Sequence, residues 1–223
     1  MDAIVSNFFD LEVARRYLPD ILSGVIVTLQ LAGLVVVSGL ALGLLLAVTR
    51  AFQIRPVNLV LILFVDVFRA VPPLVIMILV YFALPYAGVQ LSGFASAWLS
   101  LMLVLAAFAE EIYWAGILSV DKGQWEASRS TGLSFFQTLV HVVLLQAIRM
   151  TIPPLTNRTI AITKNTALAS VVAVQEILSQ AGAAQAFAAN TTPLTMASIA
   201  YLLIFMPLVV LSRWVETRFA WTR

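Results

Sequence analysis

The sequence contains no cysteine and a single histidine, and only 11% of its 223 residues are charged. Without cysteine it forms no disulfide framework, and with one histidine it offers no recognisable metal site. Soluble domains have about 25% charged residues, so a surface this poor in charge would not stay in water. The formal net charge of +2 gives no basic face for nucleic acid. The composition excludes a soluble enzyme, a nucleic-acid-binding module and a disordered chain.

Hydrophobic residues make up 61% of the chain, and the mean hydropathy is +0.99. They collect in long windows, and an α-helix needs about 20 apolar residues to cross a bilayer. A membrane β-barrel would instead require strands of alternating polarity, which the sequence does not show. We therefore expect an all-α, polytopic protein of the lipid bilayer with five transmembrane helices. The expected spans are residues 21–49, 57–84, 93–117, 142–164 and 194–212.

Two other parts of the chain fit none of these spans. Residues 1–20 are polar and charged, which argues against a cleavable signal peptide. Apolar residues among them predict an amphipathic segment at the membrane surface. Residues 165–193 are rich in Ala, Ser, Gln and Asn, with Glu176 as their one charge. There we expect a short re-entrant or outer-surface helix, with a short sixth span as the alternative.

Apart from Arg15 and Arg16, which have acidic neighbours, the basic residues of the loops and tails sort to one side of the expected membrane. They follow the first, third and fifth spans: Arg50, Arg55, Lys122, Arg129, Arg149, Arg213, Arg218 and Arg223. By the positive-inside rule this side is cytoplasmic. The N-terminus and residues 1–20 are then outside, in the periplasm, and the C-terminus is cytoplasmic, with a tail over residues 218–223. Residues 118–141 form the longest cytoplasmic loop.

That loop contains the signals of two short helices. Asp121 can cap a first helix, because its carboxylate accepts the free amides of a first turn. Gly132 can end this helix in the left-handed conformation, and Ser134 can cap a second helix. On spacing alone, the loop is as well explained by an ordinary helix–turn–helix connection.

Five ordered motifs give the chain a resemblance to a known family. Glu126, Ala127 and Ser128, followed by Gly132, resemble the EAA cytoplasmic loop of permease subunits of ATP-binding-cassette (ABC) importers. The other motifs are FRAVPPL (68–74), EIYWAGI (111–117), PPLTN (153–157) and KNTALAS (164–170). Together they resemble, more narrowly, the permeases for polar amino acids (histidine, glutamine, glutamate, arginine and opines). The similarity extends over about residues 22–215.

This resemblance implies a type I ABC importer fold, with an ABC type-1 transmembrane domain over residues 21–217. The chain would be half of an amino acid translocation pathway in the bacterial inner membrane, closed by a second permease, identical or paralogous. Two ATPase subunits would bind ATP and Mg²⁺, and a periplasmic binding protein would deliver the substrate. The chain lacks a Gly-x-x-x-x-Gly-Lys-Ser/Thr loop, so we expect it to bind no cofactor and not to be an enzyme by itself.

In this resemblance the cytoplasmic loop couples the permease mechanically to the ATPase. Its first short helix would dock in a groove of the ATPase and move when the ATPases close on ATP. The residues assigned to this coupling loop are Trp125, Glu126, Ala127, Ser128 and Gly132.

Charged residues inside the spans are candidates for the pathway or its gate. A charge at the centre of a membrane helix costs about 2.5–3.5 kcal/mol, so each needs protein, water or a ligand beside it. Asp66 and Arg69 share a helical face and can pair, and Arg69 can reach Glu111 on another helix. For these three we favour a structural or gating ion pair over direct substrate contact. Glu110 points about 100° away from Glu111 around the helix and can face the cavity.

A second group of candidates follows the fourth span. Pro153 and Pro154 predict a break in that helix, whose freed carbonyls a polar ligand could use. The polar residues beyond it are Lys164, Asn165 and Thr166. For Lys164, an alternative is that it reaches the outer lipid headgroups.

Two other classes of function stay open at this point. A stand-alone carrier driven by an ion gradient usually shows internal repeats of hydropathy, and none is visible between the two halves. An intramembrane enzyme would need a catalytic pair at membrane depth, and the chain has neither cysteine nor a histidine in the middle of a span. We therefore assign no catalytic residue and no metal ligand.

Overall fold

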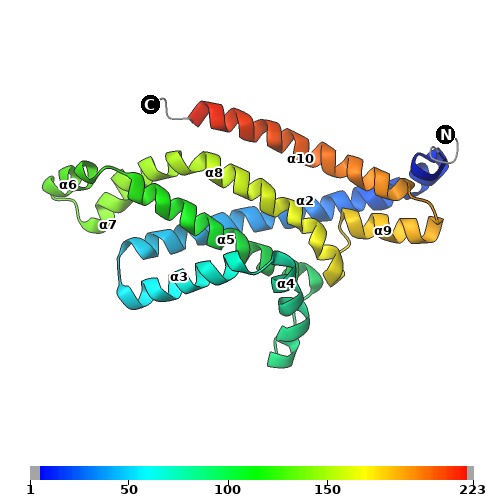
Figure 1. Ribbon diagram of the computed structural model, residues 1–223, viewed down its shortest axis with the longest axis horizontal. Helices are drawn as coiled ribbons and strands as arrows, with labels where there is room; N and C mark the ends of the chain where they lie inside the picture. Colours follow the sequence, from blue (N-terminus) through cyan, green and yellow to red (C-terminus); the bar gives the residue numbers. More distant parts are fainter. Residues whose placement is uncertain (1–5, 220–223) are drawn as a thin grey trace.

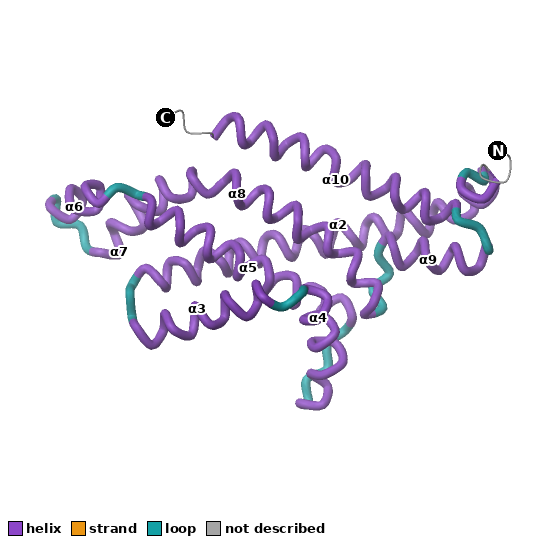
Figure 2. The backbone as a smooth tube through the Cα atoms, viewed as in Figure 1, coloured by secondary structure: helices purple, strands orange, loops and turns teal. Residues whose placement is uncertain are grey.

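The computed structural model describes residues 6–219, and helices joined by short turns make up this part of the chain, which contains no β-strand. The long helices run side by side along the molecule (Figures 1 and 2). In order they are α2 (Leu11–Ala51), α3 (Arg55–Ala70), α4 (Pro73–Ile78), α5 (Gly93–Ser119), α6 (Lys122–Ser130), α7 (Phe135–Thr138), α8 (Leu144–Lys164), α9 (Ile177–Ala188) and α10 (Thr192–Phe219). Short 3₁₀ or π segments are η1 (Leu79–Ala83), η2 (Leu84–Ala87), η3 (Leu139–Val143) and η4 (Asn165–Val172).

The spans follow from the hydropathy of the sequence. Within residues 6–219, four helical stretches are long and apolar enough to cross a membrane, and a bent pair of helices provides a fifth. The four contain α2, α5, α8 and α10, and the bent pair starts with α3. The expectation of an all-α, polytopic membrane protein is therefore confirmed.

The helix of the first span extends beyond the expected apolar stretch, because α2 begins at Leu11 instead of residue 21. The Oδ1 atom of Asp10 accepts the N–H groups of Glu12 and Val13 at 2.8 and 3.1 Å, which starts the helix there. Pro19 lies inside α2 without ending it. Residues 11–20 are thus helical and continuous with the first span, whereas residues 1–5 of the expected surface segment lie outside the described residues.

The second span, expected over residues 57–84 with an interruption at Pro72-Pro73, is broken at that pair. The chain turns by 104° between α3 and α4, and α4 points away from the bundle in Figure 1. Pro72 and Pro73 have no N–H to donate, and a proline disfavours helical geometry in the residue before it. Val71 is accordingly extended, with φ −84° and ψ 131°.

Pro153 and Pro154 do not break α8, so the break expected there is wrong. Neighbouring helices commonly hold a proline-containing membrane helix together, and α8 packs on both α5 and α10. The helical stretch continues through η4 to Val172 and then turns into α9. With 12 residues, α9 is too short to span a bilayer, which agrees with the short helix expected in residues 165–193 and not with a sixth span.

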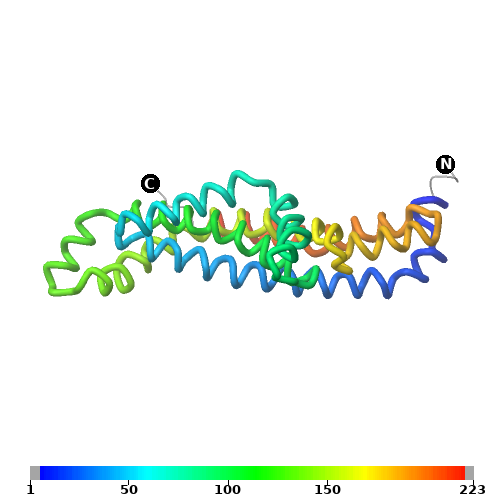
Figure 3. Tube along the Cα trace, turned by 90° about the horizontal axis from the view of Figure 1, so that it is seen from below, coloured from blue at the N-terminus to red at the C-terminus, as the bar shows by residue number. Residues whose placement is uncertain are grey.

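The centre of the bundle is the contact between α2 and α5, and α5 is the most buried of the spans. The buried residues of α2 that face α5 recur at intervals of four, at Val35, Gly39, Gly43 and Ala47. Small side chains among them let the two backbones approach each other. A Cβ atom on Gly43 would lie 2.6 Å from the Cβ of Ala109, and one on Gly39 would lie 2.9 Å from the Cβ of Leu105. The position of α5 therefore depends on these glycines. The connection from α5 through α6 and α7 to α8 lies at one end of the molecule, and α9 lies at the other (Figure 3).

Candidate functional site

The coupling loop folds as two short helices at the end of the bundle. Asp121 caps α6, its Oδ1 atom accepting the N–H of Gly123 at 2.6 Å. Gly132 follows α6 with φ +89°, the left-handed conformation that favours glycine. Ser134 and Gln137 then form a reciprocal capping box that starts α7. These are the local signals that the sequence indicated, and they give α6 a defined beginning and end.

The residues of α6 divide into an inner and an outer face. Trp125 stacks on Phe135, with ring centroids 5.4 Å apart, and Ser128 is buried, its hydroxyl donating to the Gln124 carbonyl at 2.6 Å. Glu126 and Ala127 are exposed. Trp125 therefore holds α6 against its own chain, and the outer face is what α6 offers to another subunit.

A buried ion pair joins the ends of α2 and α5 near this loop. Arg50 contacts both carboxylate oxygens of Glu110, at 3.0 and 3.2 Å, and Glu110 is fully buried. The guanidinium also lies 5.0 Å from the ring centroid of Trp114, and the Arg50 carbonyl accepts the Asn58 side chain at 3.2 Å. Glu110 thus points into the α2–α5 contact and not into a cavity.

A second ion pair joins the bent span to α5. The Nη1 atom of Arg69, at the end of α3, lies 2.7 Å from the Oε1 atom of Glu111. The alternative partner, Asp66, is exposed and forms no ion pair with any described residue. The cross-helix contact therefore exists, whereas the pairing between Asp66 and Arg69 on one helix face does not.

The bend between α3 and α4 borders a polar cavity of about 360 Å³, which we call the bend cavity. Its lining comes from α3, α4, α5, α8 and the residue after α8: Phe68, Arg69, Ala70, Val71, Pro72, Pro73, Val104, Phe108, Arg158, Ala161, Ile162 and Asn165. Because Pro72 and Pro73 lack N–H groups, the carbonyls of Phe68 and Arg69 lose the donors that a continuous helix would supply. The cavity thus combines two guanidinium groups, an amide and two backbone acceptors.

The sequence candidates only partly meet in this cavity. Arg69 and Asn165 line it, and Glu111 pairs with Arg69 but is not among the lining residues. Lys164 is exposed and does not line it, and Thr166 is buried, with its hydroxyl donating to the Thr163 carbonyl at 2.8 Å. Arg158 was missed because it lies one residue beyond the PPLTN motif, although a count of charges inside the fourth span would have found it.

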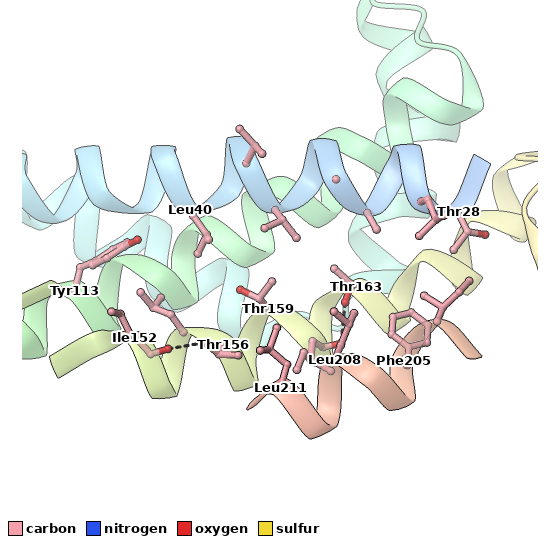
Figure 4. A pocket seen from close by; sticks show the side chains of 18 of the residues that line it. Thr28, Leu40, Tyr113, Ile152, Thr156, Thr159, Thr163, Phe205, Leu208 and Leu211 are labelled. Carbon is pink, nitrogen blue, oxygen red and sulfur yellow. Dashed lines mark hydrogen bonds between the residues drawn. The ribbon is translucent and has the colours of Figure 1, made fainter. Parts of the chain in front are cut away.

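A larger cavity of about 610 Å³ lies between α2, α8 and α10 (Figure 4). Most of its lining is aliphatic, and the hydroxyls of Thr28, Thr156 and Thr163 donate to carbonyls of their own helices at 2.8–3.0 Å. A charged amino acid would lose its hydration here and gain few partners. The bend cavity is therefore the better site for a polar solute.

A helical bundle with a sharply bent span, a charged cavity at the bend and a capped helical loop at one end belongs to the class of multi-pass membrane transport proteins. Residues 39–221 match the family described as binding-protein-dependent transport system inner membrane component. The chain belongs to this family. Its members are transport components and not enzymes, which decides against the intramembrane enzyme and the stand-alone carrier.

Curated relatives and solved structures agree with this assignment. The chain is 37% identical to the L-cystine transport system permease protein TcyB of Bacillus subtilis, over 76% of its length and 72% of the relative's. It is 31% identical to the arginine transport system permease protein ArtQ of the same organism, over 94% and 96%. A chain in a crystal structure of an amino acid ABC transporter superposes with a TM-score of 0.84 at 31% identity, over 94% and 98%. The MetNI methionine ABC transporter, at 20% identity and a TM-score of 0.65, shares the fold.

Proposed function

We propose that this chain is the permease subunit of an ATP-driven amino acid importer in a bacterial inner membrane. The similar proteins named for L-cystine and arginine transport support an amino acid substrate. The observation that carries the coupling role is α6, which is capped at both ends and keeps Glu126 and Ala127 exposed at the end of the bundle. Because the chain has no phosphate-binding loop, a separate pair of ATPase subunits holds ATP and Mg²⁺.

The loop is connected to two of the four helices that line the bend cavity. On one side α6 follows α5, which holds Glu111 and Phe108, and on the other α7 leads through η3 into α8, which holds Arg158. Packed helices move as rigid bodies, so a displacement of α6 would tilt α5 and α8 together. Trp125, Ser128 and Gly132 then keep α6 rigid, and Glu126 and Ala127 contact the ATPase.

A second permease, identical or paralogous, closes the pathway. Asp66 and Arg69 belong to a membrane-spanning segment and are exposed on this chain. A charge facing lipid at the centre of the bilayer costs about 2.5–3.5 kcal/mol, so another subunit or water must cover this face. The positive-inside rule supports a cytoplasmic C-terminus and an outer N-terminus, with a periplasmic binding protein delivering substrate to the α9 end.

The bend cavity would hold the amino acid during passage. The freed carbonyls of Phe68 and Arg69 lie at the C-terminal end of α3, where the helix dipole is negative, and suit the α-ammonium group. Broken helices supply such backbone groups to the midplane sites of other transporters. The Arg69–Glu111 pair would fix the bend, and Asn165 would contribute an amide that both donates and accepts.

Copurification and ATP hydrolysis test this proposal. The permease is expressed with its ATPase and binding protein, purified and reconstituted into vesicles. Amino acid together with the binding protein should stimulate ATP hydrolysis, and uptake should require ATP. A chain that purifies without an ATPase and whose uptake follows an ion gradient would contradict the proposal.

A further inference from the structure

The bend cavity carries more positive than negative charge. Arg69 and Arg158 both line it and both contact Phe108, with their Cζ atoms 5.4 and 3.1 Å from its ring centroid. Glu111 compensates Arg69 at 2.7 Å. Arg158 forms no ion pair and no hydrogen bond with any residue between 6 and 219, and the nearby Glu111 carboxylate, which attracts it, is already paired with Arg69.

Arg69 and Arg158 thus share the single carboxylate of Glu111. Phe108 provides a cation–π contact, which attracts the guanidinium but does not neutralise it. Asn165 lies seven residues further along, on the same face of the helical stretch, and contributes a neutral amide. Because an unpaired charge in a membrane span is costly, the cavity is suited to a ligand that brings the missing negative charge.

We propose that the bend cavity selects amino acids with an acidic side chain and that Arg158 binds the side-chain carboxylate. This inference rests on the proposed function, since it names the substrate class of the same site. A guanidinium binds a carboxylate through two parallel N–H···O bonds. The α-ammonium group meets the freed carbonyls at the end of α3, and the extra carboxylate neutralises Arg158. A lysine or arginine substrate would instead place a second positive charge beside it.

Binding to the purified permease–ATPase complex tests the selection by the cavity itself, because the binding protein is left out. Equilibrium binding is measured with radiolabelled L-glutamate, L-glutamine and L-lysine. The unaltered complex should bind glutamate at least about tenfold more tightly than lysine, since like charges brought together disfavour a complex. Arg158→Gln should lower the affinity for glutamate by about tenfold or more and leave the affinity for glutamine nearly unchanged. Arg158→Glu should reverse the order of affinities, so that lysine binds more tightly than glutamate.

Arg149→Gln is the matched control, because Arg149 is an exposed arginine of α8 that does not line the cavity. It should leave the order of the three ligands unchanged. Equal weakening of all three by Arg158→Gln would overturn the inference, because Arg158 would then hold the α-carboxylate that every amino acid shares.

The two proposals fail in different ways. If the unaltered complex binds lysine as tightly as glutamate, or binds no glutamate, the inference is overturned even where the variants do not assemble. ATP-driven uptake of another amino acid by the same complex would leave the proposed function standing. Absence of ATP-driven uptake of any amino acid would overturn the proposed function, and the inference with it.

Discussion

At the scale of single residues, the charges inside the spans find their partners on other helices. Glu110 and Glu111 are neighbours on α5, yet Glu110 pairs with Arg50 of α2 and Glu111 pairs with Arg69 of α3. The two pairs therefore hold α5 to two different helices, one near the coupling loop and one at the bend.

Arg50→Ala should destabilise the protein by about 3–5 kcal/mol, because it leaves the fully buried Glu110 carboxylate without its cation. Chemical unfolding in detergent, followed by circular dichroism, measures the change. Arg55→Ala is the control: Arg55 is exposed and forms no ion pair within the described residues, so its removal should stay within about 0.5 kcal/mol. Equal stability of the two variants would show that the buried pair is unimportant.

Individual residues also show how far sequence reasoning reaches. The spacing of Asp66 and Arg69 allows a pair, but a side chain chooses its partner by which helix packs beside it, and sequence spacing does not give that. For the same reason the sequence left open whether Glu110 faces a cavity or another helix. A count of charges in the fourth span would have singled out Arg158, but not that it lines the bend cavity, because other residues of α8 line the apolar cavity.

At the scale of elements, the close approach of α2 to α5 depends on glycine. Gly43→Ala should lower the free energy of unfolding by about 1–3 kcal/mol, because the new Cβ lies 2.6 Å from that of Ala109 and the helices must separate. Gly33→Ala, on the same helix, meets nothing within 4 Å and should be neutral or stabilising. The same unfolding measurement compares them, and a Gly43→Ala variant as stable as Gly33→Ala would refute the packing argument.

The turn after α6 gives a second prediction at this scale. Gly132 has φ +89°, and a Cβ there would meet nothing within 4 Å, so a substitution acts through backbone conformation alone. Asparagine tolerates this conformation, whereas a β-branched residue resists it, and left-handed geometry costs an L-residue about 1–2 kcal/mol. We expect Gly132→Val to reduce ATP-driven uptake by about tenfold and Gly132→Asn to reduce it much less. Vesicle uptake assays with matched amounts of assembled complex measure this, and equal uptake by both variants would contradict it.

The two proline pairs mark the limit of prediction for elements. Pro72-Pro73 and Pro153-Pro154 have the same local chemistry, yet the first ends a helix and the second lies inside one. The 16-residue α3 ends at its pair, whereas α8 continues through its pair while packed on α5 and α10. Tertiary packing therefore separates the two cases. Cap signals were more reliable, since Asp121, Gly132 and Ser134 act locally.

At the scale of the whole molecule, hydropathy was sufficient for the class and the approximate spans, because a membrane helix needs only length and apolarity. It did not locate the bend cavity, whose lining comes from four helices and the residue after α8. Two of these helices, α5 and α8, are also the ones that flank α6 and α7 in the chain. A transport role thus follows from how the loop is connected to the cavity.

The central claim is that the outer face of α6 contacts the ATPase from the cytoplasm. Because the chain has no cysteine, a single Glu126→Cys variant can carry a thiol-linked photo-crosslinker at one defined position of the assembled transporter. Tyr86→Cys, at the exposed turn of η2, is the control. We predict a crosslink from position 126 to the ATPase, with a yield that changes on adding ATP, and none from position 86. Labelling of position 126 by a membrane-impermeant thiol reagent outside intact cells, or no crosslink to the ATPase, would contradict the account.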